Sequence, residues 1–71
     1  MENSDLTPRQ RAVIEAVIKH GGQKRASREL GITIETIGTH MEAIRWKMEA
    51  PTTLAACIAY DRKAREVLVR G

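Results

Sequence analysis

Glycine and proline residues divide this chain into four short segments, and each segment has the apolar spacing of an α-helix. The first segment begins with Thr7-Pro8-Arg9-Gln10, which supplies a capping residue, a proline suited to the first helical position and a capping-box glutamine. Gly21 and Gly22 end this helix. Gly31 ends a second helix over 23–30, and we expect it to adopt a left-handed turn. These signals predict the all-α class.

Two longer helices follow in the second half of the chain. Thr33 is suited to cap a third helix, which continues to about Met48. Pro51 then breaks the chain, and one of the paired threonines after it opens a fourth helix to about Val69. The expected architecture is therefore a four-helix domain.

The length of 71 residues allows one domain, with 1–5 as a flexible N-terminus and 6–71 as the folded part. A single cysteine, Cys57, excludes an internal disulfide. His20 and His40 do not form metal-binding spacing with it, so we expect neither a metal nor a cofactor. Packing against a second copy is then the expected source of extra stability.

The third helix has two distinct faces at 100° per residue. The apolar face, with His40 at its edge, should pack on the core: Ile37, Met41, Ile44 and Met48. The opposite face should be free: Glu35, Thr39, Glu42 and Trp46, flanked by Gly38 and Arg45. Because an exposed tryptophan is costly, packing of Trp46 on the fourth helix is expected. Contact with a second copy or with a sugar-phosphate backbone is the alternative.

The order of short helix, tight turn, cap and longer amphipathic helix over 23–48 predicts a helix-turn-helix. That motif needs a small residue where its helices touch, a turn residue that can adopt unusual backbone dihedral angles, and an apolar anchor beneath the second helix. Ser27, Gly31 and Ile37 occupy those places. In such a motif the second helix enters the DNA major groove.

Basic charge is concentrated in the first half of the chain. Residues 8–28 hold six lysines and arginines and one glutamate, whereas the whole chain has a net charge of only +3. This distribution is the electrostatic footprint of phosphate binding, and a solvated helix face is the alternative.

Three stretches resemble the LuxR/GerE-type DNA-binding domain: 6–11 (LTPRQR), 28–33 (RELGIT) and 36–41 (TIGTHM). The resemblance covers about residues 6–60. It implies a third helix that reads the major groove and a fourth helix that pairs two copies on DNA. The second helix, which begins Gln-Lys-Arg-Ala-Ser, is closer to the FIS type, and part of the pattern is shared with sigma-factor region 4. Gly38 and Glu42 stand where family members often carry basic residues, and Glu49 replaces the usual glycine after the third helix.

The candidate DNA contacts follow from this arrangement. Base contacts are expected from the third helix: Glu35, Thr36, Gly38, Thr39 and Glu42. Phosphate contacts are expected from the basic groups and one histidine: Arg9, Arg11, Lys24, Arg25, Arg28, His40, Arg45 and Lys47. Several have other interpretations. Thr36 and Thr39 are also compatible with a neutral helix surface. Glu42 can instead repel phosphates at wrong sites. Arg45 and Lys47 can instead stabilise the C-terminal end of the helix dipole.

The fourth helix is apolar or small almost all round between Leu54 and Tyr60. One side is expected to join the core, with Cys57 as a buried small hydrophobe, and the other to form a dimer interface. The interface candidates are Leu54, Ala55, Ala56, Ile58, Ala59 and Arg62. The alternative is that alanine is simply a good helix former there.

These features favour a non-enzymatic, sequence-specific regulator of transcription that binds double-stranded DNA as a homodimer on an inverted repeat. The start of the motif near Leu6 predicts a stand-alone repressor or autoregulator, as phages and mobile elements encode, without a small-molecule ligand. The polar start and the absence of a long apolar run predict a cytoplasmic protein without a membrane contact. Two alternatives remain open: a protein that binds and blocks another regulator, and a phage DNA-packaging recognition subunit.

Overall fold

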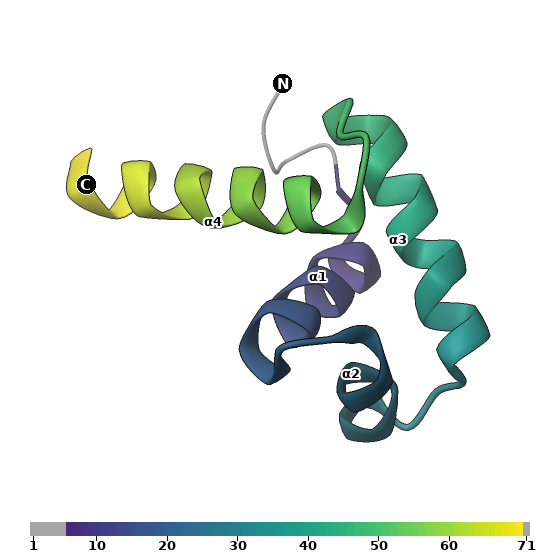
Figure 1. Cartoon of the computed structure of the whole chain (residues 1–71). Coiled ribbons are helices and arrows are strands. Elements are labelled where there is room, and N and C mark those ends of the chain that lie inside the picture. The colour runs from purple at the N-terminus through teal and green to yellow at the C-terminus, as the bar shows by residue number, and fades with distance from the viewer. Residues whose placement is uncertain (1–5, 71) are drawn as a thin grey trace.

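The computed structural model describes residues 6–70, with side chains described through Arg65. The described range contains four helices and no strand (Figure 1): α1 (Pro8–His20), α2 (Gln23–Leu30), α3 (Ile34–Met48) and α4 (Thr53–Arg70). The predicted all-α fold is confirmed, and the helix boundaries fall within a residue or so of those expected. The flexible N-terminus expected over 1–5 lies outside the described residues.

The helix N-termini use the threonines that the sequence indicated. Thr7 and Gln10 form a reciprocal capping box, in which each backbone N–H donates to the other's side-chain oxygen. Thr33 caps α3, since its Oγ1 accepts from the backbone N–H of Thr36 at 3.1 Å. Before α4, the Oγ1 of Thr52 accepts from the N–H of Ala55 at 3.0 Å.

The C-termini of α1, α2 and α3 all end in left-handed residues. Gly21 and Gly31 have φ values of 77° and 70°, so the turn predicted for Gly31 is present. The third such residue is Glu49, with φ 54°. At Gly31 and Glu49 the hydrogen bonds match. At each position, the residue's own N–H donates to the carbonyl three residues earlier. The N–H of the following residue donates to the carbonyl five residues before itself, which is the Schellman pattern.

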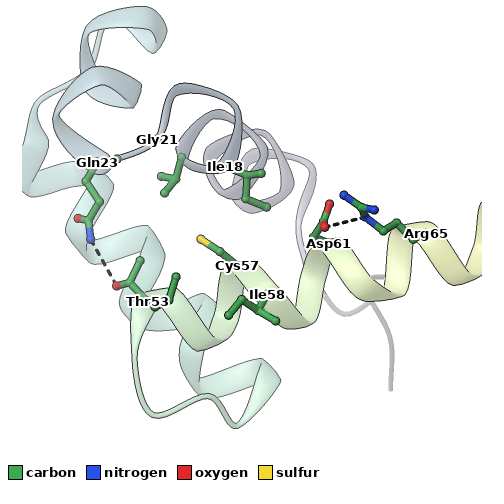
Figure 2. A pocket seen from close by; sticks show the side chains of 11 residues that line it. Ile18, Gly21, Gln23, Thr53, Cys57, Ile58, Asp61 and Arg65 are labelled. Atoms are coloured by element: carbon green, nitrogen blue, oxygen red, sulfur yellow. Dashed lines mark hydrogen bonds and ion pairs between the residues drawn. The ribbon is translucent and has the colours of Figure 1, made fainter.

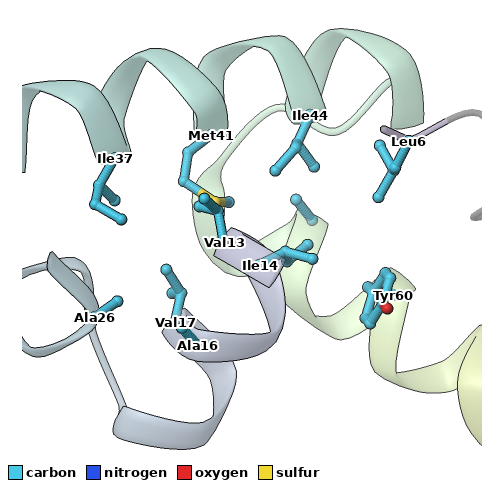
Figure 3. Close-up of a cluster of buried hydrophobic side chains, with 11 residues drawn as sticks. Leu6, Val13, Ile14, Ala16, Val17, Ala26, Ile37, Met41, Ile44 and Tyr60 are labelled. Carbon is cyan, nitrogen blue, oxygen red and sulfur yellow. The ribbon is translucent and has the colours of Figure 1, made fainter. Parts of the chain in front are cut away.

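The core is built around α1, which contacts each of the other three helices (Figure 3). The largest fully buried side chains of the core come from α1 and α3: Val13, Ile14, Ile37, Met41 and Ile44. The apolar face predicted for α3 therefore packs as expected, with Met48 only partly buried. This packing leaves the opposite face of α3 in solvent.

Residue Ala26, rather than the expected Ser27, is the fully buried residue of α2. Ser27 is half-buried, and its hydroxyl donates back to the carbonyl of Lys24 within the helix. The small residue at the helix contact is thus one position earlier, because the buried side of α2 centres on Ala26.

The first half of α4 packs on α3 and α1, whereas its C-terminal turns extend beyond the other helices (Figure 1). Ala56 and Tyr60 are its buried side chains in the described range. The Tyr60 hydroxyl donates to a Glu15 carboxylate oxygen at 2.5 Å, which ties α4 to α1. Burial, the hydrogen bond to Glu15 and the charge of Glu15 raise the pKa of Tyr60 to about 12.

Candidate nucleic-acid interface

Helices α2 and α3 pack against each other and are joined by the three residues 31–33. Gly31 turns the chain, Ile32 lies partly buried against the core, and Thr33 starts α3. Ile37 is fully buried beneath α3, as its role of anchor requires. The geometry is that of a helix-turn-helix whose second helix presents a free outer face.

A hollow lies along this outer face, between α3 and the N-terminal ends of α2 and α4. Four of the five predicted base-contacting residues line it: Glu35, Gly38, Thr39 and Glu42. Arg45 of α3 also lines it, together with Gln23 and Thr53 from the neighbouring helices. Thr36, the fifth candidate, is exposed near the start of α3 outside this hollow. The structure therefore gathers most of the predicted contact residues on one surface.

Both threonine hydroxyls on this surface already have partners within α3 or its cap. The Thr36 and Thr33 hydroxyls share a hydrogen bond at 2.9 Å. The Thr39 hydroxyl donates to the carbonyl of Glu35 at 3.1 Å. Because each oxygen retains acceptor capacity, Thr36 and Thr39 can still accept from a donor on DNA.

Gly38 has open space where a side chain would point. Its φ is unexceptional and a Cβ built there meets no atom within 4 Å, so packing does not require a glycine. The missing side chain instead lets the backbone of α3 come closer to a ligand than any other residue would allow.

The basic side chains of α2 are well placed to meet a polyanion. Lys24, Arg25 and Arg28 are all exposed. At 3.6 residues per turn, Lys24 and Arg28 lie on the side opposite the buried Ala26. On α1, Arg9 and Arg11 are exposed as well, and an Arg11 guanidinium nitrogen donates to the carbonyl of Leu6 at 3.4 Å.

The remaining phosphate candidates are more closely tied to the fold. An Arg45 guanidinium nitrogen donates to the carbonyl of Pro51, which holds the loop after α3. Lys47 Nζ donates to Gln10 Oε1 at 2.8 Å, linking the end of α3 to the capping box of α1. His40 is half-buried at the edge of the apolar face. Arg45 and Lys47 thus have structural roles besides any contact with DNA.

The expected packing of Trp46 on α4 is wrong. This side chain is 82% exposed, the highest value among the large apolar residues described. The neighbouring Arg45 supplies the link to the segment before α4. Trp46 continues the outer face of α3, four residues beyond Glu42.

The candidate dimer surface on α4 is only partly available. Leu54 and Ile58 are 69% and 51% exposed, Arg62 is exposed, and Ala55 and Ala59 are half-buried. Ala56 is wrong as an interface residue, because it is fully buried in the protomer's own core. Since Ala56 and Tyr60 face inward, one turn apart, the free side of α4 is the one that carries Leu54 and Ile58.

Leu54 and Ile58 border an apolar groove between α4 and the end of α1 (Figure 2). Val17, Ile18 and Cys57 form much of its floor, and an ion pair between Asp61 and Arg65 lies at one end. Cys57 is half-buried, less deeply than expected, and burial raises the pKa of its thiol.

Two residues of the outer hollow were missed by the sequence analysis. The side-chain amide of Gln23 donates to the Thr53 hydroxyl at 3.3 Å, which joins the starts of α2 and α4 (Figure 2). Each begins a helix, and helix N-termini attract phosphate through their free N–H groups and dipole. That position was the available signal for both residues.

A free outer face on the second helix of a helix-turn-helix, beside an exposed basic helix, defines a DNA-binding domain. Residues 4–59 match the family described as bacterial regulatory proteins of the LuxR family (GerE). The chain therefore belongs to the LuxR family, and it is a DNA-binding regulator of transcription whose partner is double-stranded DNA. No individual curated protein and no solved structure gives a significant match.

Membrane-spanning helices and metal-binding clusters are both absent from the described residues. Within that part of the chain, no helix is long and apolar enough to cross a bilayer. The same residues contain no cluster of three or more His, Cys, Asp or Glu side chains that could hold a metal ion. The family itself is one of DNA-binding regulators.

Proposed function

We propose that this protein is a sequence-specific repressor that binds an inverted repeat as a homodimer. The observation that supports the proposal is the outer face of α3. Glu35, Gly38, Thr39 and Glu42 line one solvent-open hollow there, while the opposite face of the same helix is anchored by Ile37. A rigid helix with an open, polar face can enter a major groove without rearrangement.

In this proposal, hydrogen-bond acceptors on the outer face of α3 select the bases more than positively charged side chains do. Glu42 and Glu35 are exposed carboxylates that can accept from the amino group of cytosine. At a site without that cytosine, no amino group offsets the repulsion between the carboxylate and the DNA phosphates, so binding there is disfavoured. Gly38 allows close approach of the backbone, and the Thr39 methyl group can contact a thymine methyl.

Affinity would come from α2 and the start of α1. Lys24, Arg25 and Arg28 are exposed on the helix that crosses the DNA backbone in a helix-turn-helix. Neutralising phosphates releases counterions, so these contacts should make binding strongly salt-dependent. Gln23 and Thr53 add polar groups at two helix N-termini beside the same hollow.

Dimerisation would use the free side of α4. Leu54 and Ile58 are exposed apolar residues one turn apart, next to the apolar groove. A two-fold contact through this side would present two copies of α3 to half-sites about one helical turn apart. Occupation of such a site near a promoter would block transcription, which makes repression, including autoregulation, the simplest outcome.

The decisive experiment is selection from a pool of random duplex DNA at two salt concentrations, with the recovered sequences read out. A recovered two-fold motif with half-sites about one helical turn apart would support the proposal. Weak binding without a motif that disappears at moderate salt would contradict it.

Two single-residue variants refine that selection. Thr39→Ala and Glu42→Gln should change the recovered half-site sequence, because both residues line the proposed reading face. Glu29→Gln, which removes an exposed carboxylate from α2, is the matched control and should leave the motif unchanged. An unchanged motif in both α3 variants would exclude this face as the reader.

A further inference from the structure

The C-terminal half of α3 carries a second surface hollow, which adjoins the one that contains Thr39 and shares Glu42 and Arg45 with it. It is lined by Glu42, Arg45, Trp46, Glu49 and Ala50. Glu42 precedes Trp46 by four residues, so the two lie on one side of α3, and Glu49, the residue that ends the helix, lines the same hollow. All three are exposed. We name Glu42, Trp46 and Glu49 the Trp46 patch.

The two carboxylates of the Trp46 patch form no ion pair among the described residues. Among the described residues, the side-chain carboxylate of neither Glu42 nor Glu49 has a hydrogen-bond or ion-pair partner. Arg45 is a cation in the same hollow and keeps its charge, but its guanidinium donates to the carbonyl of Pro51 and forms no ion pair with either carboxylate. An indole that is 82% exposed therefore lines one hollow together with two carboxylates that form no ion pair.

We propose that the Trp46 patch is a docking site for an arginine side chain in a basic segment of another protein. A guanidinium is planar and weakly hydrated, so it stacks on an indole face while its N–H groups remain free. The carboxylates that line the same hollow can then accept from those N–H groups. Trp46 supplies the surface, and Glu42 and Glu49 supply the charge complementarity.

DNA is a poor occupant for the Trp46 and Glu49 end of the patch, whereas Glu42 also lines the proposed reading face. Trp46 lies ten residues after Thr36, which is about 15 Å along the helix axis at about 1.5 Å per residue. The N-terminal residues of a recognition helix are the ones that contact base edges, and Trp46 lies at the other end of α3. A phosphate close to Glu49 would be repelled. The docking proposal does not depend on sequence-specific DNA binding, and the two can be tested separately.

Trp46 is the chain's one tryptophan, so its fluorescence reports directly on the patch. The probe is a blocked hexapeptide in which arginine alternates with alanine, and the control peptide has glutamine in place of arginine. Titration of wild-type protein should give a saturable change in emission with the arginine peptide alone. A fluorescein-labelled form of the arginine peptide gives the same affinity by anisotropy.

Three variants separate docking from general charge attraction. Trp46→Ala and Glu49→Gln should each weaken the anisotropy signal at least about fivefold, because each removes one part of the proposed contact. Glu29→Gln removes an equal charge from α2 and should leave the affinity unchanged. Circular dichroism of each variant establishes that the helices are intact.

Several outcomes would overturn the proposal. Absence of saturable binding, equal binding of the glutamine peptide, or an equal loss in Glu29→Gln would each do so. Binding of labelled duplex DNA is measured in parallel. If Trp46→Ala weakens DNA binding and leaves peptide binding intact, Trp46 is a DNA contact and not a protein-docking residue.

Discussion

Replacing Glu49 with glycine should stabilise this protein, although it removes a side chain. Glu49 is the sole non-glycine residue in the described range with positive φ, at 54°, and it ends α3 in a Schellman turn. A side chain in that conformation costs about 1–2 kcal/mol. Glycine removes this strain but gives the unfolded chain more freedom, which offsets about 0.4–1 kcal/mol. The net gain expected for Glu49→Gly is about 1 kcal/mol.

The gain is large enough to measure in a domain of this size. About 1 kcal/mol corresponds to a rise in melting temperature of about 4–8 °C for 60–100 residues. Urea unfolding followed by circular dichroism should show a higher midpoint with an unchanged slope, since the same surface is exposed on unfolding. Both measurements are made at one protein concentration, because dimerisation would make stability concentration-dependent.

Two matched variants isolate the backbone as the cause. Glu49→Ala keeps the strained φ and removes only the carboxylate from the helix C-terminus, so it should gain at most a few tenths of a kcal/mol. Gly31→Ala introduces the same strain into the equivalent turn after α2, where φ is 70°, and should destabilise by about 1 kcal/mol or more. Equal gains in Glu49→Ala and Glu49→Gly would refute the strain argument, and so would a loss of stability in Glu49→Gly.

The remaining predictions concern the DNA surface, α4 and the Tyr60 contact. Charge reversal of Lys24, Arg25 and Arg28 should weaken binding to all duplex sequences and flatten the dependence of affinity on salt; an unchanged salt slope would remove α2 from the phosphate contacts. Ile58→Glu should give folded monomers by light scattering and circular dichroism, whereas Ala56→Glu should unfold the protomer because Ala56 is fully buried; a dimeric Ile58→Glu would exclude that side of α4. The pKa of Tyr60, ordinarily 10.0, is raised to about 12 in the folded protein by burial and by Glu15. Stability from this contact is therefore complete below pH 10 and lost as the pH rises towards 12. In urea titrations between pH 9 and about 11.5, the free energy of unfolding of Tyr60→Phe should fall less than that of wild type. An equal fall in both proteins would contradict the assignment of this pH dependence to Tyr60.

Local sequence signals predicted the helices well because the capping interactions are local. The Thr7–Gln10 box and the Thr33 cap each join residues three positions apart, so the pattern contains the whole interaction. The apolar face of α3 was equally clear, because Ile37, Met41 and Ile44 recur at helical spacing against polar neighbours. The same contrast predicted which residues of α3 line the outer hollow.

Errors arose where periodic contrast is weak or where the partner is distant in sequence. In α4, small and apolar residues surround the helix, so nothing local indicates that Ala56 faces inward and Ile58 outward. The bond from Lys47 to Gln10 and that from Gln23 to Thr53 join residues 37 and 30 positions apart. Trp46 was assigned to packing on a general cost of exposure, and that cost does not say which surface is close enough to cover it.

The anchoring of α2 has a consequence for how the protein meets DNA. Of the eight residues of this helix, Ala26 alone is fully buried, alanine contributes little apolar area, and Leu30 packs on the core only in part. Its amide hydrogens should therefore exchange with solvent sooner than those of the central turns of α1, through local opening of the helix alone. Because Lys24 and Arg28 belong to this weakly held element, binding to phosphates must also restrict its motion. The same contact should slow amide exchange throughout α2, so that the helix is at its most ordered when the protein is bound to DNA.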